Sequence, residues 1–320
     1  MITKESWGKT AAGKEVFLYT LTNQNGLSVQ VTTFGARIVA VNTPDRSGKL
    51  GNIIVGPDTL EGFEAHNNFF GATIGRYGNR IAGGSFELDG HTYELTRNEG
   101  SNTLHGGAGV HNCVWESAED GEQVIMTLLS PDGTDGFPGN MTLVSRFALT
   151  DSNELVLTLQ AVSDKPTVCA LTNHAYWNLS DGASIGECEL RLSADHYLEV
   201  NAELIPSVIA SVEGTRYDFR TSHPFGHELY DHHFIFNGAA GPQAEAYSPA
   251  TGRTMAVTAD LPGAQLFTFP KFGVQPPEAG AFCIEPQFNP DSPHHPEWPS
   301  VVLRPGEMWN HEIRIAFGVK

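Results

Sequence analysis

Gly84-Ser85-Phe86-Glu87-Leu88-Asp89-Gly90-His91-Thr92-Tyr93-Glu94-Leu95 is the stretch that decides the fold class. Residues 85–88 and 91–95 each alternate polar and apolar side chains, which is the period-two pattern of a strand with one buried face. The dipeptide Asp89-Gly90 stands between them and tolerates the positive φ angles of a two-residue turn. The stretch therefore predicts an antiparallel hairpin.

The same alternation recurs along the chain. A second hairpin is predicted from residues 141–149 and 155–162, with its turn at 151–153. Further strands are expected at residues 16–21, 27–33, 187–192, 253–258, 281–284, 300–303 and 311–317. No long window carries a helical stripe, although short helical turns are expected near 59–66. We predict an all-β protein, a sandwich of antiparallel sheets, in which residues 1–320 form one domain because no linker or repeat interrupts them.

The charge balance argues against several kinds of partner. The chain has 320 residues, with 37 Asp and Glu against 19 Lys and Arg, and its formal net charge is −18. Such a surface repels nucleic acid and anionic membranes, and no stretch approaches the ~18 apolar residues of a membrane span. The four cysteines form no C-x-x-C pair, and residues 1–14 contain no signal-like apolar run. We therefore expect a cytoplasmic protein with reduced cysteines and without nucleic-acid or membrane partners.

Several polar clusters interrupt the strand pattern. Each combines hydrogen-bonding side chains with glycines or aromatic rings, the mixture that a sugar site needs for hydroxyl groups and for the C–H face of the ring. The clusters lie at residues 75–80, 98–107, 173–179, 230–234 and 284–295. Glu285 follows the apolar run 281–284, and a carboxylate at the end of a buried strand favours a functional role.

Single residues in these clusters also have simpler interpretations. Taken alone, Arg80 suits a surface ion pair, His105 suits a turn beside two glycines, and Asp231 suits a turn or cap. His174 taken alone is equally well explained as a hydrogen-bonded core histidine. The histidine pairs at 232–233 and 294–295 raise the question of a metal, but no cysteine or H-x-H spacing accompanies them, so we expect no metal site.

Taken in order, the clusters resemble the galactose mutarotase (aldose 1-epimerase) family. The similarity runs from residue 75 to residue 307 and rests on G-R-x-x-N-R-I at 75–81, N-x-G-x-N-x-L-H-G-G at 98–107, N-H-x-Y-x-N-L at 173–179, D-F-R at 218–220, Y-D-H-x-F at 230–234, E-x-Q-x-x-P-D at 285–291 and P-S…P-G-E at 299–307. The resemblance implies a β-supersandwich fold and cofactor-free interconversion of the α and β anomers of hexoses such as galactose and glucose. The chain departs from the family pattern at His233, at Pro286 and at residues 267–270.

The resemblance also implies roles for individual residues. His174 would be the general acid and Glu285 the general base. The residues expected to contact the sugar are Asn79, Arg80, His105, Tyr176, Asn178, Asp231 and Gln265. We therefore expect an isomerase that acts on a monosaccharide, as a monomer or homodimer, without metal or cofactor.

One acid and one base suffice for this reaction. Ring opening removes the proton from O1 and delivers a proton to the ring oxygen, and ring closure reverses both transfers. We expect the carboxylate of Glu285 to raise the pKa of His174 and so to keep the acid charged.

Three other functions deserve comparison. A hexose-6-phosphate epimerase would need clustered basic residues, which the acidic composition disfavours. A glycoside hydrolase would use two carboxylates, with Asp231 as the partner of Glu285. A non-catalytic sugar-binding or regulatory protein on the same fold would not need both His174 and Glu285.

Overall fold

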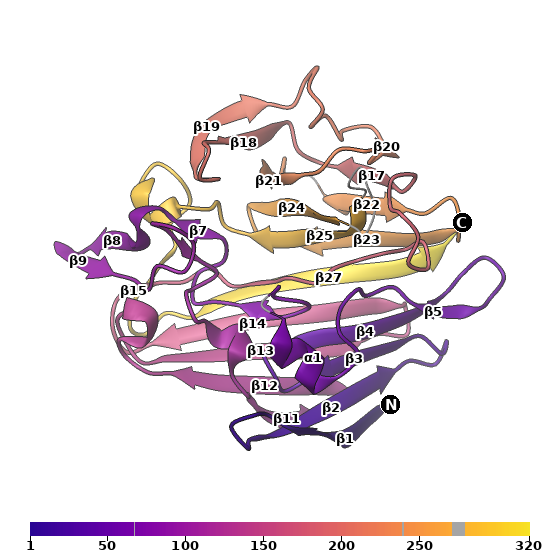
Figure 1. Ribbon diagram of the computed structural model, residues 1–320, viewed down its shortest axis with the longest axis horizontal. Coiled ribbons are helices and arrows are strands. Elements are labelled where there is room, and N and C mark those ends of the chain that lie inside the picture. The colour runs from indigo at the N-terminus through magenta and orange to yellow at the C-terminus, as the bar shows by residue number, and fades with distance from the viewer. Residues whose placement is uncertain (67, 239, 271–278) are drawn as a thin grey trace.

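The computed structural model describes residues 1–66, 68–238, 240–270 and 279–320, and β-strands dominate this part of the chain (Figure 1). Every pairing between the named strands is antiparallel. The single α-helix of the described residues, α1 (Leu60–Ala65), is capped by the Thr59 side chain and lies within the range where helical turns were expected. The all-β prediction is confirmed.

Three larger sheets carry the architecture. The first has the strand order β1-β2-β3-β4-β5, with strands Ile2–Lys9, Glu15–Thr22, Ser28–Thr32, Arg37–Pro44 and Leu50–Asn52. The second has the order β11-β12-β13-β14-β27-β23-β22-β17-β20, with strands Glu116–Asp120, Gln123–Ser130, Met141–Leu149, Glu154–Ser163, Trp309–Val319, Arg253–Ala259, Ala244–Tyr247, Glu189–Leu192 and His223–Pro224. The third has the order β19-β18-β21-β24-β25, with strands Pro206–Ser211, His196–Val200, Asp231–Ile235, Gly263–Pro270 and Ala279–Gln287.

Short strand pairs and helical turns fill the connections between these sheets. The pairs are β6 (Thr73–Ile74) with β16 (Thr172–Asn173), β7 (Arg80–Ile81) with β10 (Thr103–Leu104), β8 (Ser85–Leu88) with β9 (His91–Glu94), and β15 (Thr167–Val168) with β26 (Val302–Leu303). The 3-10 turns are η1 (Ala82–Gly84), η2 (Val110–Asn112), η3 (Thr134–Gly136) and η4 (Ser292–His294).

Both predicted hairpins form. In the first, Leu88 pairs with His91 across a two-residue turn in which Asp89 and Gly90 have φ angles of 53° and 79°. In the second, β13 pairs with β14 along its whole length, and its residues alternate between buried and half-buried. The strand expected at 281–284 is longer than predicted, because β25 extends from Ala279 to Gln287 and is buried on both faces. Glu285 therefore lies inside this strand and not at its end.

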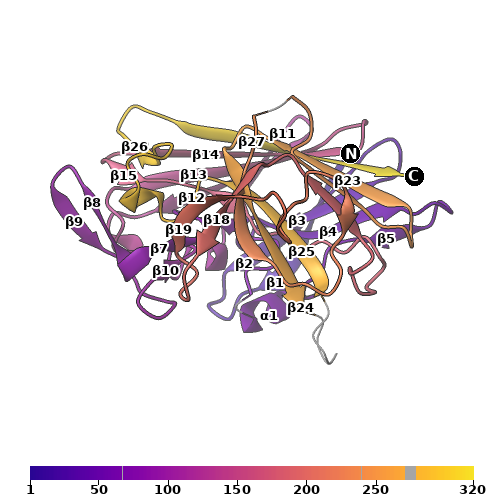
Figure 2. The same cartoon turned by 90° about the horizontal axis from the view of Figure 1, so that it is seen from above.

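The core lies between sheets that face each other. The nine-stranded sheet contacts the first five-stranded sheet through β13 with β2 and β3, and through β27 with β4. In Figure 2, β14 and β27 run along one side of the molecule, and α1 and the end of β24 lie on the opposite side. One buried cluster of apolar side chains reaches from Tyr19 to Phe317. This packing brings β16 against β25, and it is the contact that positions the site.

Two further features concern the cysteines and the helix. Cys169, Cys188 and Cys283 are buried, Cys113 is half-buried, and all four are free thiols. No helix among the described residues has the length and apolar character needed to cross a bilayer.

Candidate functional site

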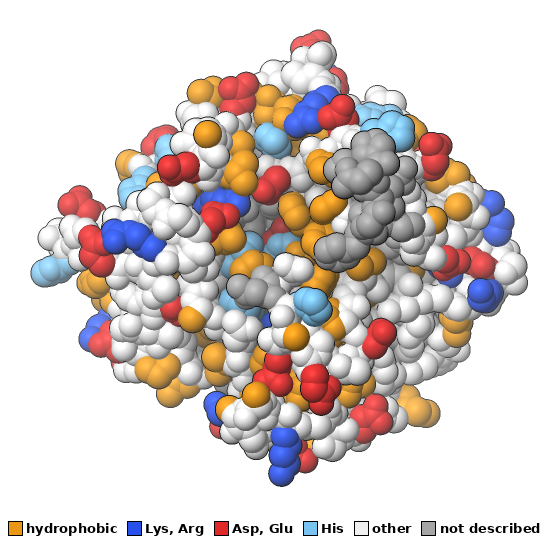
Figure 3. All heavy atoms as spheres, viewed as in Figure 1, with side chains coloured by type: hydrophobic (Ala, Val, Ile, Leu, Met, Phe, Trp, Pro, Cys, Tyr) orange, Lys and Arg blue, Asp and Glu red, His pale blue; other side chains and the backbone are white. Residues whose placement is uncertain are grey.

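The residues expected to contact a sugar converge on one cavity, with a single exception. The cavity has a volume of about 190 Å³, below the ~300 Å³ at which pockets for drug-sized ligands begin. In Figure 3 the surface is hollowed near the centre of the view, and histidine side chains gather in the hollow. The cavity is lined by Asn68, Phe69, Asn79, Arg80, Leu104, His105, His174, Tyr176, Asp231, Gln265, Phe267, Phe269 and Glu285. The exception is Asn178.

Three neighbouring strands supply one wall of the cavity. Glu285 on β25 pairs directly with Gln265 on β24, so their side chains leave the same face of the sheet. Asp231 begins the next strand, β21, and its Oδ1 accepts a hydrogen bond of 2.6 Å from Nε2 of Gln265. The pleat of the sheet therefore aligns two carboxyl groups and one amide along the cavity.

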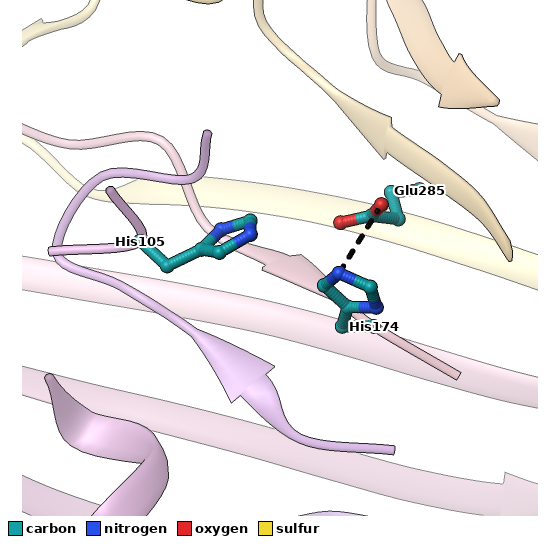
Figure 4. Close-up of side chains that lie close together, drawn as sticks. All are labelled: His105, His174 and Glu285. Atoms are coloured by element: carbon teal, nitrogen blue, oxygen red, sulfur yellow. Dashed lines mark ion pairs between the residues drawn. The ribbon is translucent and has the colours of Figure 1, made fainter. Parts of the chain in front are cut away.

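His174 enters the cavity from the opposite side, immediately after β16. Its backbone N–H donates to the Ala72 carbonyl at 2.9 Å, and its carbonyl accepts from the Gly71 N–H at 2.9 Å. Its ring stacks on the Tyr176 ring at 4.8 Å between centroids, with an interplanar angle of 15°. His174 Nε2 lies 3.6 Å from Oε1 of Glu285, as the dashed line in Figure 4 shows.

Burial controls the charge of this pair. The side chains of His174 and Glu285 are only 6% and 2% exposed. Burial lowers the pKa of His174 to about 3, and burial, assisted by Asp231, raises the pKa of Glu285 well above its usual value. The expectation that Glu285 would raise the pKa of His174 is therefore wrong, because the loss of hydration disfavours both charged forms. The 3.6 Å separation exceeds hydrogen-bond length, and Glu285 Oε2 and His174 Nδ1 have no hydrogen-bond partner among the described residues.

His105 faces the same pair and is held by the backbone (Figure 4). It lies at a turn with a left-handed φ of 51° and is 5% exposed, so it is both a turn residue and a cavity residue. Its Nδ1 accepts a hydrogen bond of 3.1 Å from the backbone N–H of Asn79. Burial lowers the pKa of His105 well below its usual value, so the ring is neutral and carries its proton on Nε2.

Arg80 is the one Lys or Arg among the described cavity-lining residues. It is buried rather than exposed, but it does form an ion pair: Nε and Nη2 donate to the two carboxylate oxygens of Glu99 at 2.6 and 2.8 Å. Nη2 also lies 4.0 Å from Asp231 Oδ2. Burial raises the pKa of Asp231, whereas Arg80 opposes this rise.

The sequence profile of the aldose 1-epimerase family matches residues 18–316. The chain belongs to the aldose 1-epimerase family. A galactose mutarotase of Bos taurus is 35% identical over 92% of this chain and 92% of its own length, and an aldose 1-epimerase of Escherichia coli is 33% identical over 93% and 94%. The crystal structure of a GalM/aldose epimerase homologue from C. elegans superposes with a TM-score of 0.88 at 31% identity, covering 94% of this chain and 98% of that one.

A second solved structure agrees with this assignment. The galactose 1-epimerase of Lactobacillus acidophilus gives a TM-score of 0.87 at 28% identity, covering 100% of this chain and 99% of that one. The expected galactose mutarotase-like β-supersandwich fold is confirmed by these superpositions and by the antiparallel sheets.

The prediction that Asn178 contacts the sugar needs correction, because Asn178 is not part of the described cavity lining. Its Nδ2 donates to the carbonyls of Ala183 and Gly280 at 2.8 and 2.7 Å. Its Oδ1 accepts from the N–H groups of Ser180 and Gly182 at 2.7 and 3.3 Å. The amide's usual bonding capacity is thus used by the turn that follows His174 and by the Gly280 carbonyl of β25, which indicates a structural role.

Tyr176, by contrast, lines the cavity with its ring. Its hydroxyl donates to the Asn68 carbonyl at 2.6 Å, so the stacked ring and not the hydroxyl meets the cavity. Of the departures from the family pattern, Phe267 and Phe269 line the cavity, whereas His233 and Pro286 do not. Phe69 and Glu99 were missed from sequence. The ring of Phe69, at a left-handed φ of 55°, contacts those of His105 and His174.

The cluster of His105, His174 and Glu285 needs a test as a metal site. Each residue offers a nitrogen or oxygen within 4.8 Å of the others, and two histidines with a glutamate form a known zinc ligand set. However, the Asn79 N–H occupies Nδ1 of His105 and leaves the proton on Nε2, so this ring has no free lone pair for a cation. The three residues present do not fit a metal ion. The pairs at 232–233 and 294–295 lie outside this cluster.

A larger pocket of about 400 Å³ adjoins the cavity and shares Asn68 and Phe269 with it. Its described lining is mainly apolar and includes neither His174 nor Glu285. The smaller cavity, which holds the titratable pair, is therefore the candidate active site despite its size.

Proposed function

We propose that the chain is an isomerase, an aldose 1-epimerase that interconverts the α and β anomers of neutral aldohexoses such as galactose and glucose. Its His174 and Glu285 would exchange the protons. The observation that carries the proposal is the placement of this pair, 3.6 Å apart in a cavity with polar walls. Family membership supports the reaction, and the geometry supports the residues.

The proton balance of ring opening suits the pair. Glu285 as carboxylate takes the proton from O1, and the C1–O5 bond breaks while the imidazolium of His174 protonates the ring oxygen. The open-chain aldehyde then rotates about C1–C2. Return of both protons closes the ring on the other face of C1. No proton is exchanged with solvent, so the reaction can proceed in a buried cavity.

Burial helps this cycle by destabilising its charged state. Before ring opening the pair is an ion pair, and afterwards it is a neutral imidazole and a neutral carboxylic acid. Low hydration penalises the ion pair, in agreement with the lowered pKa of His174 and the raised pKa of Glu285. The surroundings therefore favour transfer of both protons, and the open-chain sugar is formed next to a neutral pair.

The remaining walls can orient the sugar. Arg80 retains N–H groups that Glu99 does not use, and Gln265 Oε1 is buried without a hydrogen-bond partner in the part of the chain that the structure describes. His105 supplies the proton on Nε2 as a fixed donor. The Tyr176 ring, stacked on that of His174, adds apolar surface to the cavity lining for C–H groups. Positioning of this kind converts slow spontaneous anomer exchange into a fast reaction at one site.

The direct test is polarimetry on freshly dissolved α-D-galactose and α-D-glucose. The first-order rate constant should rise linearly with protein concentration above the spontaneous rate for at least one neutral sugar. A folded protein that accelerates none of a panel of neutral aldoses would contradict the proposal. Release of nitrophenol from a nitrophenyl glycoside would identify a hydrolase instead.

A further inference from the structure

We propose that Glu99 determines specificity, because it neutralises Arg80 at the edge of the cavity and so restricts the site to uncharged sugars. This inference rests on the proposed function and deepens it. It concerns which ligands the site rejects, namely sugars that carry a carboxylate or phosphate.

The geometry of the Arg80–Glu99 pair is that of a committed ion pair. Arg80 Nε and Nη2 donate to Glu99 Oε2 and Oε1 at 2.6 and 2.8 Å, the two-bond arrangement by which guanidinium also recognises carboxylate or phosphate ligands. One of the two edges through which Arg80 could bind an anionic group is thus already filled by a carboxylate of the chain itself.

The charge count around the cavity points the same way. Arg80 is the one arginine or lysine in the described lining, and Glu99, Asp231 and Glu285 are close to it. Burial lowers the pKa of His105 and keeps that ring neutral, and a positive charge on His174 is matched by the carboxylate of Glu285 3.6 Å away, so neither histidine adds net positive charge to the cavity. Arg37 is buried nearby, but its guanidinium donates to the carbonyls of Phe70 and His111 and is not part of the lining, so the described lining holds no second Lys or Arg to balance an anionic ligand. A neutral hydroxyl group avoids this penalty and can still accept a hydrogen bond from an N–H group of Arg80 that Glu99 does not use.

Glu99 can change the charge of the site without changing the shape of the cavity, because it is not one of the lining residues. Arg80 is 8% exposed at its side chain and Glu99 is 36% exposed, so the pair joins the buried cavity to the surface. The backbone of Glu99 exchanges hydrogen bonds with Asn102 in a tight turn, at 3.3 and 2.9 Å. Because the turn fixes the backbone, a neutral side chain of equal size at residue 99 would remove the charge while the lining residues stay in place.

The test compares Glu99→Gln with wild type, using ligands that differ in charge at C6. Galacturonate and galactose 6-phosphate are the anionic ligands, and 6-deoxygalactose is the neutral reference. Each is added at anomeric equilibrium as a competitor of galactose mutarotation. In Glu99→Gln we expect inhibition by both anionic ligands to tighten about tenfold relative to the neutral reference, because Arg80 becomes available to them. The gain should shrink in high salt, which screens partly exposed charges.

Glu94→Gln is the matched control, because Glu94 pairs with Arg97 at 2.7 Å on the exposed surface and lies outside the cavity lining. This variant has the same net charge as Glu99→Gln and should leave the selectivity unchanged. Equal tightening for neutral and anionic ligands in Glu99→Gln, or the same gain in Glu94→Gln, would overturn the proposal. Calorimetric titration of the same ligands tests the charge filter without catalysis, so a failure of the mutarotase function is distinguishable from a failure of this inference.

Discussion

A double-mutant cycle of Glu285 and His174 gives the sharpest test of the proposed mechanism. Glu285→Gln preserves the size of the side chain and removes its ability to accept a proton. His174→Asn removes the acid while keeping a polar group. Ring opening needs both proton transfers, one to Glu285 and one from His174. A variant that lacks either residue therefore gains little from the other. The two losses should therefore overlap and should not multiply.

The structure sets the expected magnitudes. A positioned acid or base typically contributes ~10²–10⁴-fold, so each single variant should lose that factor in kcat/KM. Independent effects would give ~10⁴–10⁸-fold for the double variant, whereas we expect it to be no more than about tenfold below the worse single variant. Glu285→Gln should stay folded, because Glu285 Oε2 loses no hydrogen bond to any described residue and the amide carries no charge to bury.

The assay is polarimetry on fresh α-D-galactose, with the spontaneous rate subtracted, alongside thermal unfolding of each variant. The unfolding data separate a catalytic loss from a folding defect, which matters for His174→Asn because the stacked Tyr176 ring loses its neighbour. A Glu285→Gln variant with a rate near wild type would remove Glu285 from the mechanism. Multiplicative losses in the double variant would show that the two groups act separately.

Two further predictions follow from the fold and from the charge of the site. On the acid side, kcat/KM should fall only at a pH well below the ordinary histidine pKa of ~6.5. The reason is that the His174–Glu285 pair takes up a second proton, and so loses its base, only as the pH falls through the lowered pKa of His174, about 3. Activity is measured at once after dilution into each buffer, and a half-maximal value at pH 6–7 would refute this prediction. Gly71→Ala should lower the free energy of unfolding, measured with denaturant, by more than about 3 kcal/mol, because residue 71 has a φ of 65° and a Cβ there would collide with the Ile38 carbonyl. Gly13→Ala is the comparison: its φ is 79°, but the space around it is open, so this variant should lose only about 1–2 kcal/mol. Equal losses in the two glycine variants would show that the close approach at residue 71 carries no energetic weight.

The sequence predicted the strands in which buried residues alternate with less buried ones. In β13 every second residue is buried, and the bounds of the strand match the expectation. Prediction was less accurate for β25, which is buried on both faces, because alternation disappears when neither face meets water. The two-residue strands β6 and β16 are too short to carry any pattern, yet they hold the segment that presents His174.

The candidate site was predicted from a motif series, and its failures have physical causes. Asn178 lies four residues from His174 in a matching motif, but its hydrogen bonds are decided by the local turn. The direction of the His174 pKa shift depends on burial, which three separate chain segments create together. Glu99 is 19 residues from its partner Arg80, so only the folded chain reveals the pair.

The position of β27 has a consequence for how the protein is made. This strand follows all the other described strands in the sequence, yet it pairs with β14 on one side and β23 on the other. During synthesis on the ribosome, the two halves of the nine-stranded sheet must wait with unpaired edges until residues 309–319 emerge. Such edges attract other strands. Nascent chains that stall before this point should be the species that depend most on chaperones.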